Sequence, residues 1–181
     1  ENVMVGRARQ AVERADVALV VADAAAGVAD QDLRIVAAAL AMGRGVVLAL
    51  NKWDAIETRN FDAVAKELRR RLKNAAHVPI VSISALERLR VRRLLEVGLE
   101  VAANAERRIQ TSALNELLAE LAPKAPAGVR LKYAMQKSVL PPSFVIFGTA
   151  RPPANLANYL ANSIRRTADF RGVPIVMEFK R

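Results

Sequence analysis

The first half of the chain contains three short runs of consecutive apolar residues, separated by longer segments with a helical pattern. The three runs are residues 17–22, 46–50 and 79–83, of which the last is interrupted only by Ser82. Because they are continuously apolar rather than alternating, they are typical of parallel strands covered on both faces. The segments with apolar residues three or four positions apart are 4–15, 31–42, 60–73 and 89–107. Strands that alternate with helices in this way predict a parallel α/β sheet.

Individual residues mark where two of these helices begin and end. Asp30 is placed to cap the helix at 31–42, because a carboxylate before the first turn can accept its free N–H groups. Gly43 is placed to end that helix, and Asn60 to open the helix at 60–73.

The pattern changes after residue 107 and predicts a second, smaller unit. A helix at 111–121 is followed by the proline-rich segment 123–128. The remaining predicted elements are a strand at 130–136, a strand at 143–148, a helix at 155–168 and a strand at 173–179. This order, α-β-β-α-β, predicts an α+β unit of about 70 residues, so we place two domains at 1–107 and 108–181.

A candidate binding motif, Asn51-Lys52-Trp53-Asp54, directly follows the second apolar run. Guanine presents two adjacent donors, its ring N–H and its amino group, and one carboxylate such as Asp54 can accept both. Asn51 can reach the acceptor edge of the base and brace neighbouring loops, while the stem of Lys52 can cover the base face. A paired carboxylate of this kind rejects bases that lack the donors. The alternative is that Asn51 and Asp54 only cap the next helix.

A second element supports the guanine interpretation. Ser84, Ala85 and Leu86 follow the third apolar run, about thirty residues after the first motif. A backbone N–H in such a loop can donate to the guanine carbonyl, and a small residue lets the main chain approach. N-K-x-D and S-A-L at this separation together predict a guanine-nucleotide site.

The motifs that hold phosphate are not found in the sequence. Neither Gly-Lys-Ser nor Gly-Lys-Thr occurs, although a G-x-x-x-x-G-K-[ST] loop would be needed to cradle the phosphates. The only D-x-x-G match is residues 169–172, which we interpret as a turn, and residues 23–27 have the wrong spacing. We therefore predict no catalytic residue in this chain and no GTP hydrolysis by it alone.

Composition and charge bear on three questions: whether the protein spans a membrane, whether it binds a metal, and what kind of partner it has. The chain has 181 residues, 52% of them hydrophobic, and no cysteine. No apolar run approaches the roughly 20 residues that span a membrane, so we expect a cytoplasmic protein. His77 is the sole histidine, so we predict no metal site. The chain has a net charge of +10, and residues 105–181 alone carry 12 basic and 5 acidic groups. This concentration of positive charge indicates either a polyanionic partner or simply a solvated basic surface.

Taken together, these residues resemble the Der/EngA family of bacterial GTPases, which have two G domains in tandem and then a KH-like domain. The segments that carry the resemblance are Glu13-Arg14-Ala15-Asp16-Val17, Asp23 through Gln31-Asp32, Asn51-Lys52-Trp53-Asp54, Pro79-Ile80-Val81, Ser84-Ala85-Leu86, Arg107-Arg108-Ile109, Thr111-Ser112 and Pro141-Pro142-Ser143-Phe144-Val145. The resemblance implies the C-terminal half of a P-loop GTPase domain with a three-layer parallel sheet, then a complete KH-like domain. The chain starts at Glu1, and we expect it to be a piece of a longer protein.

The resemblance also implies a function and partners. It implies GTP or GDP with Mg²⁺ in the full-length parent, and assembly of the large ribosomal subunit, with that particle or its rRNA as a partner. It assigns guanine binding to Asn51, Lys52 and Asp54, with Ser84-Ala85 closing over the base. The missing N-terminal G domains would be further partners. We expect no tight nucleotide binding by this chain alone.

Two departures from the family pattern qualify these expectations. After Leu86 the chain has Glu87-Arg88-Leu89-Arg90 where the family usually has a glycine-containing turn. It also lacks G-x-x-G, with which ordinary KH domains clamp a nucleic-acid backbone.

A non-enzymatic module that docks on RNA, on a ribosome or on the parent's other domains is the alternative function. The candidate contacts are Arg130, Lys132, Lys137, Arg165, Arg166, Lys180 and Arg181. Each could instead be a solvated surface charge. Four aromatic residues could stack on bases, although their alternation fits a small core better. They are Tyr133, Phe144, Phe147 and Phe179.

Overall fold

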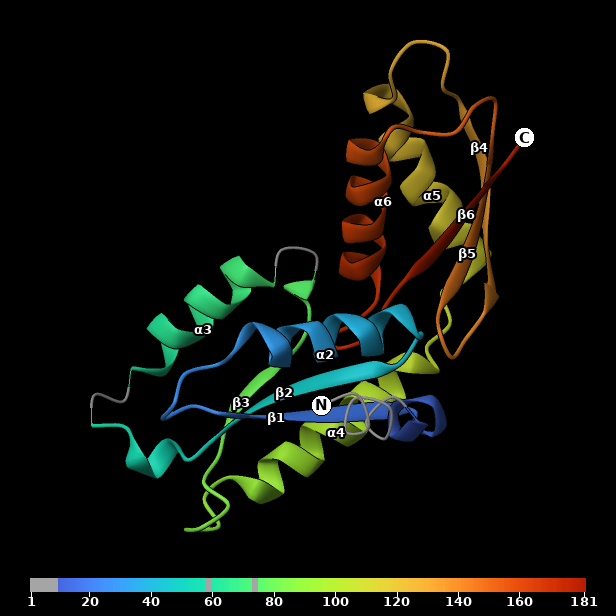
Figure 1. The fold of residues 1–181 in the computed structure, drawn as a ribbon. Coiled ribbons are helices and arrows are strands. Elements are labelled where there is room, and N and C mark those ends of the chain that lie inside the picture. Colours follow the sequence, from blue (N-terminus) through green and yellow to red (C-terminus); the bar gives the residue numbers. More distant parts are fainter. Residues whose placement is uncertain (1–9, 58–59, 73–74) are drawn as a thin grey trace. The chain divides into compact units, whose positions relative to one another are not determined.

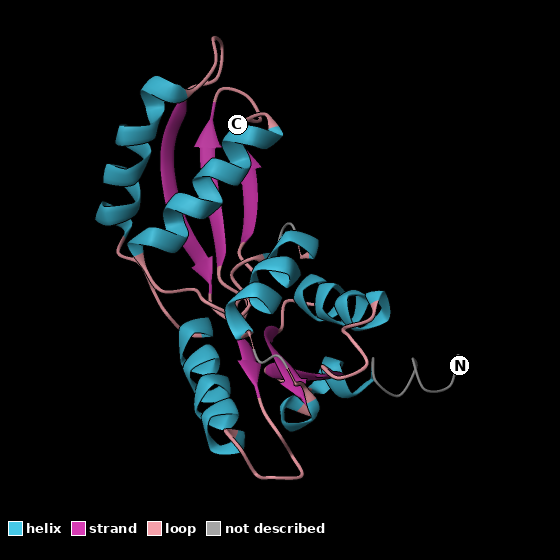
Figure 2. Cartoon of the chain, turned by 90° about the vertical axis from the view of Figure 1, so that its left-hand side faces the viewer, coloured by secondary structure: helices cyan, strands magenta, loops and turns pink. Residues whose placement is uncertain are grey.

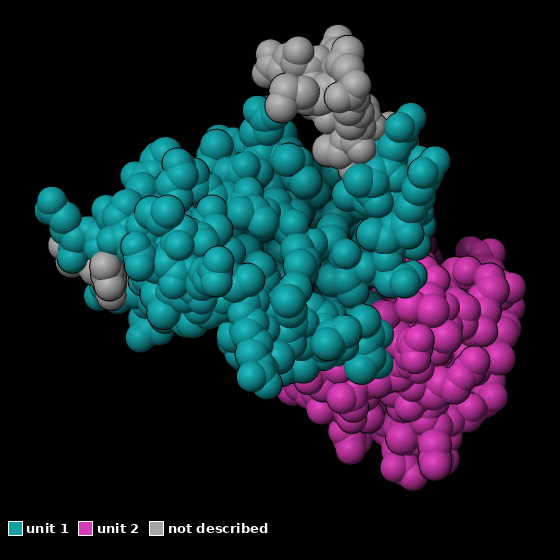
Figure 3. Space-filling model, turned by 90° about the horizontal axis from the view of Figure 1, so that it is seen from below, with its two compact units in different colours: residues 1–103, 171–173 teal, residues 104–170, 174–181 magenta. Residues whose placement is uncertain are grey.

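The computed structural model describes residues 10–57, 60–72 and 75–181. The start of the helix predicted at 4–15 and the end of the one predicted at 60–73 lie outside these ranges. The chain forms two compact units, which Figure 3 shows in different colours. The first unit is residues 1–103 with 171–173, and the second is residues 104–170 with 174–181.

The first unit is built on a parallel three-stranded sheet in the order β1-β2-β3. Its strands are β1 (Val17–Asp23), β2 (Gly45–Asn51) and β3 (Ile80–Ser82), and its helices are α2 (Asp30–Ala41), α3 (Phe61–Arg71) and α4 (Val91–Ala105). Alternate residues of β1 and β2 pack with α2 and α3 in one core, while Gly98 of α4 lies against Leu19 on the opposite side of β1. The predicted parallel α/β arrangement, with helices on both faces of the sheet, is confirmed (Figure 1).

Three predicted helix ends can be compared with the structure. Asn60 caps α3, since its side-chain oxygen accepts a hydrogen bond from Ala63 N at 3.0 Å. Gly43 adopts φ of 78° just after α2, as a helix-ending glycine does. The prediction that Asp30 caps α2 was wrong, because the helix already includes Asp30 and its N-cap is Ala29. Asp32 instead accepts from Ala29 N at 3.0 Å.

The second unit has the predicted order α-β-β-α-β, formed by α5 (Thr111–Leu121), β4 (Leu131–Ser138), β5 (Ser143–Gly148), α6 (Ala154–Thr167) and β6 (Val176–Lys180). β4 is antiparallel to β5, and β5 is parallel to β6. Both helices lie on one face of this sheet (Figures 1 and 2). They enclose a core that includes Phe144, Ile146, Leu114 and Leu160.

The edge strand β1 carries exposed apolar side chains. In the part of the first unit that the structure describes, β1 pairs only with β2, and Val21 is 54% and Leu19 38% exposed. A free strand edge next to apolar surface favours pairing with another chain. We therefore expect the purified chain to self-associate.

Placing a charge at this edge should reduce the self-association. We expect Val21→Lys to weaken it at least about tenfold, because pairing of two such edges would then bury a charge. Sedimentation velocity over a range of concentrations measures this, with Ala63→Lys at an exposed position of α3 as a substitution away from the edge. Unchanged self-association in Val21→Lys would contradict this role of β1.

Candidate guanine-recognition site

The ends of the three parallel strands bring the predicted site residues to one edge of the first sheet. In the sheet register Asp23 lies beside Asn51, and Leu50 lies beside Ser82. The segment Asn51–Asp54 and the loop that begins at Ser84 therefore leave the sheet side by side. This carboxyl edge is where open α/β sheets bind ligands.

Asn51 connects the loops that follow its two neighbouring strands. Its side-chain Oδ1 accepts a hydrogen bond from Ala85 N at 2.9 Å, and its backbone oxygen accepts one from Ala24 N at 2.9 Å. The structure thus brings the N-K-x-D and S-A-L motifs into direct contact. We predicted that a backbone N–H of this loop reaches the guanine carbonyl. The Ala85 N–H donates to Asn51 here, so a bound base that used this donor would have to share it with Asn51 or displace Asn51 from it.

Lys52 is held by an acidic residue that the sequence analysis did not select. Lys52 has a left-handed backbone, with φ of 60° and ψ of 34°, and its Nζ lies 2.6 Å from Asp23 Oδ2. Asp23 Oδ1 accepts from the backbone N–H groups of Ala25 and Ala26 at 3.0 and 3.1 Å. The hydrogen bond from Lys52 lowers the pKa of the Asp23 carboxyl, and the same contact raises the pKa of Lys52.

A sequence signal for Asp23 was nevertheless available. Asp23 is the last residue of β1, as Asn51 is the last residue of the neighbouring strand β2. Parallel strands place such residues at the same edge.

Trp53 occupies the free position of the motif and is a core residue. It opens a short 3₁₀ helix, Trp53–Ala55, and is only 3% exposed. Its backbone N–H donates to Ile83 O at 3.0 Å, and its ring meets Phe61 edge to face at 5.8 Å. The packing of Trp53 thereby fixes the backbone on both sides of it, and with it the position of Asp54.

The loop after β3 closes without the glycine that we expected from the family pattern. Ser84 and Leu89 exchange backbone hydrogen bonds of 3.1 and 2.9 Å, and Ser84 Oγ accepts from Glu87 N at 3.0 Å. Arg88 and Arg90 supply the required left-handed conformations, with φ of 54° and 57°. Leu86 projects from this loop and is 82% exposed.

Glycine at position 88 should stabilise this loop. A left-handed backbone costs a non-glycine residue about 1–2 kcal/mol, and the greater freedom of glycine in the unfolded chain offsets part of the gain. We expect Arg88→Gly to raise the free energy of unfolding by roughly 0.5–1 kcal/mol. Urea denaturation measures the change. Arg92→Gly, inside α4, is the matched control and should destabilise by about 1 kcal/mol; equal losses in the two variants would contradict the prediction.

The basic residues of the second unit that we predicted to contact RNA differ in burial and in hydrogen-bond partners. Lys137 pairs with Glu178 at 2.8 Å, and Arg166 donates to Ser163 Oγ at 2.7 Å. Arg165 donates to the backbone oxygen of Phe170 at 2.7 Å, and burial lowers the pKa of its guanidinium to about 10. These contacts give Arg165 a structural role. The candidates on the surface are Arg130, Lys132, Lys137, Arg166, Lys180 and Arg181.

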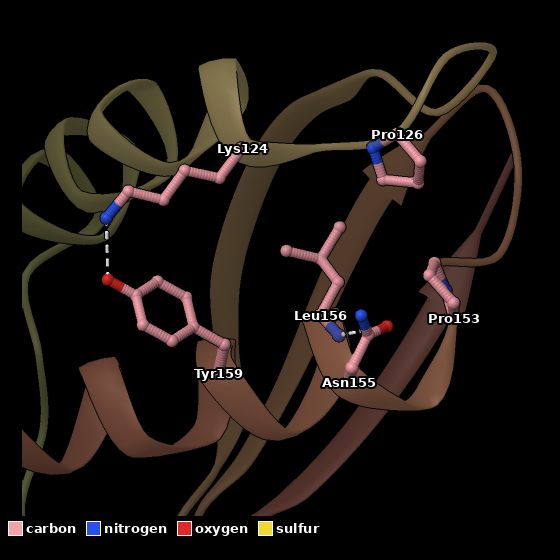
Figure 4. Close-up of a pocket in the computed structure, with 6 residues that line it drawn as sticks. All are labelled: Lys124, Pro126, Pro153, Asn155, Leu156 and Tyr159. Atoms are coloured by element: carbon pink, nitrogen blue, oxygen red, sulfur yellow. Dashed lines mark hydrogen bonds between the residues drawn. The ribbon is translucent and has the colours of Figure 1, made fainter.

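The second unit also has an open pocket of about 480 Å³ between the end of α5 and the start of α6 (Figure 4). Its lining residues are Lys124, Pro126, Pro153, Asn155, Leu156 and Tyr159. Lys124, the one cation among them, donates to the Tyr159 hydroxyl at 2.7 Å and lies 4.7 Å from the ring centre. This hydrogen bond lowers the pKa of the Tyr159 hydroxyl. We assign no ligand to the pocket, because its cation already has a partner.

The described residues contain neither a metal-binding cluster nor a membrane-spanning helix. No cluster of three or more His, Cys, Asp or Glu side chains with metal-binding geometry occurs within residues 10–57, 60–72 and 75–181. Over the same ranges, no helix has the length and apolar character needed to cross a membrane.

Comparison with known proteins agrees with this fold and these motifs. The family model "Elongation factor Tu GTP binding domain" matches residues 5–104. The model "KH-domain-like of EngA bacterial GTPase enzymes, C-terminal" matches residues 108–180. The first unit thus belongs to the family of domains that this elongation factor Tu model describes.

Curated relatives identify the family more closely. GTPase Der of Symbiobacterium thermophilum is 41% identical over 190 residues, which cover 99% of this chain and 40% of the relative. GTPase Der of Chloroherpeton thalassium is 34% identical over 186 residues, covering 97% of this chain and 42% of the relative. The chain belongs to the Der/EngA family of GTPases and matches its C-terminal portion. It spans about two fifths of the length of these relatives.

A solved structure also resembles the chain. It is that of Era in complex with MgGDPNP and nucleotides 1506–1542 of 16S ribosomal RNA, with 21% identity and a TM-score of 0.49 over 97% of this chain and 68% of that one. At this level the match supports no conclusion about fold or function.

Proposed function

We propose that the first unit recognises guanine nucleotides through Asn51, Lys52 and Asp54, with the loop Ser84-Ala85-Leu86 closing over the base. One observation carries the proposal: Asn51 Oδ1 and Ala85 N lie 2.9 Å apart. This contact joins the two motifs that each supply part of a guanine site. The alternative, in which Asn51 and Asp54 only cap the next helix, is less favoured. The N-cap of the short helix Trp53–Ala55 is Lys52, and Asn60 caps α3.

In the full-length parent we propose that this site binds GTP or GDP with Mg²⁺ during assembly of the large ribosomal subunit, and hence in the cytoplasm. The proposal includes two domains, residues 1–107 and 108–181. The chain by itself should hold phosphate poorly and hydrolyse no GTP, because catalysis of phosphoryl transfer consists mainly of positioning and electrostatics around phosphate and Mg²⁺. The sequence contains no G-K-[ST] for that task. In the parent, the missing N-terminal half of this same G domain would supply it.

The experiment that tests guanine recognition is a titration of this chain with fluorescent GDP and GTP in Mg²⁺, beside the variant Asp54→Ala. Saturable binding that unlabelled GDP displaces and ADP does not would support the proposal. Equal displacement by ADP would contradict it.

A second candidate function is docking of the second unit on ribosomal RNA. The observation that favours it is the excess of basic residues, of which Arg130, Lys132 and Lys180 are exposed. Phosphate contacts by such residues release counterions, so binding should weaken steeply as salt rises. Co-sedimentation of the chain with purified large ribosomal subunits at several salt concentrations tests this. Binding that salt does not weaken would contradict it.

A further inference from the structure

One face of the sheet in the second unit is covered by helices, whereas no described element of this unit covers the other. α5 and α6 both lie on the first face (Figures 1 and 2). On the opposite face β4 presents Tyr133 and Met135, which are 43% and 38% exposed. Their register partners on β5 are Phe147 and Val145. Val145 is only 4% exposed. We therefore call the surface formed by Tyr133, Met135 and Phe147, with Lys137, Glu178 and Lys180, the open sheet face.

The structure separates the four aromatic residues that the sequence could not tell apart. Phe144 is fully buried, and Phe179 packs against the same core beneath the helices. Tyr133 and Phe147 lie on the open sheet face instead, as register partners on adjacent strands. Their ring centres are 6.0 Å apart and their planes are tilted by 41°. The prediction that all four fit a small core therefore fails for Tyr133, whose ring is exposed.

Basic groups accompany this aromatic pair. Lys180 lies beside Phe147 in the register of β5 and β6 and is exposed, as is Arg181 next to it. On the same face Lys137 and Glu178 form an ion pair of 2.8 Å. The open sheet face thus carries two lysines, Lys137 and Lys180, against the one acidic residue of the three strands, Glu178. The face therefore combines flat apolar rings with a local excess of positive charge.

We propose that the open sheet face binds single-stranded RNA, with Tyr133 and Phe147 stacking on unpaired bases and Lys180 contacting the backbone. Aromatic side chains on an uncovered sheet can stack successive bases, because every base has an apolar face. Duplex RNA hides those faces and does not suit this surface. The inference rests on the proposed RNA-docking role of the second unit, and it assigns that role to a particular surface and to unpaired nucleotides.

The test is fluorescence anisotropy of the whole chain with a labelled ten-nucleotide oligouridylate. We expect Tyr133→Ala to weaken binding about 30-fold, the middle of the range for loss of one stacking contact. Tyr133→Phe keeps the ring and should bind as the unchanged chain does. Lys180→Ala should reduce the slope of affinity against salt by about one phosphate contact. Lys124→Ala, on the helical side, is the charge-matched control for Lys180→Ala and should leave the slope of affinity against salt unchanged.

Each other outcome would overturn the inference in an identifiable way. If Tyr133→Ala bound RNA with unchanged affinity, the open sheet face would not be the RNA-binding surface, although the second unit could still dock on RNA through another surface. Equal losses in Tyr133→Phe and Tyr133→Ala would refute stacking. Tighter binding of a duplex of the same length would refute the preference for unpaired bases. No binding of any RNA by the unchanged chain would refute RNA docking as well, without bearing on guanine recognition. If Tyr133→Ala instead abolished a dimer in sedimentation, the face would be a self-association surface.

Discussion

Replacing Asp54 by alanine is expected to abolish guanine recognition, with affinity for fluorescent GDP falling at least about 100-fold. The reason is that one carboxylate would accept both donors of the guanine edge, and a site built around such a pairing can discriminate by roughly 10⁴ to 10⁵. Asp54 lies in the 3₁₀ helix that Trp53 anchors to the core, so the substitution should leave the fold intact. The titration described above, with circular dichroism to verify folding, measures the loss.

Asp54→Asn is the sharper companion variant. An amide can donate to the carbonyl that xanthine carries in place of the guanine amino group. We therefore expect this variant to prefer xanthosine diphosphate over GDP, while Asp54→Ala binds neither. Retention of GDP affinity in both variants would refute the role of Asp54. An unchanged chain that binds no nucleotide up to millimolar concentration would indicate that base recognition needs the phosphate-binding part of the parent.

Replacing Trp53 by alanine is expected to have the largest effect on stability. Truncation of a buried aromatic side chain typically costs about 3–5 kcal/mol, through lost burial and the remaining cavity. Trp53 is 3% exposed and packs against Phe61, so we expect a loss of this size in the first unit. Urea denaturation followed by far-ultraviolet circular dichroism measures it, since the variant lacks the sole tryptophan.

Two matched variants make this prediction specific. Trp53→Phe keeps an aromatic ring and should lose less than half as much as Trp53→Ala. Leu86→Ala removes an apolar side chain that is 82% exposed, in the neighbouring loop, and should change stability by less than about 0.5 kcal/mol. A Trp53→Ala chain as stable as Leu86→Ala would show that Trp53 does not hold the motif in place.

Much of the fold was predictable from the pattern of apolar residues. Continuous apolar runs indicated strands covered on both faces, and β2 is indeed buried along nearly its whole length. The order of elements in the second unit was also correct. The errors lie at element ends, as with Asp30, because capping depends on which N–H groups a side chain reaches. Nearby residues such as Asp32 can do the same task.

The candidate site was predictable as far as its motifs but not in its internal contacts. Parallel strands place Asn51 and Ser84 at one edge, so their proximity followed from the fold class. The ion pair of Lys52 with Asp23 joins the segment after β2 to the end of β1, and no local pattern specifies such a pairing. The left-handed conformation of Arg88 was also not predictable, since the loop closure that requires it forms between Ser84 and Leu89.

The sequence alone determined which positions of each strand are apolar or polar, because the residue pattern of a strand is a local property. It also determined which motifs lie at the strand ends, because the chemistry of Asn, Lys and Asp is local too. It therefore indicated the parallel sheet, the α-β-β-α-β unit and the guanine motif. Only the tertiary structure decided that helices cover Phe144 and leave Tyr133 exposed, that Trp53 is core, and that Asp23 holds Lys52. These are decided by contacts between segments distant along the chain, and such contacts form only once the elements have packed.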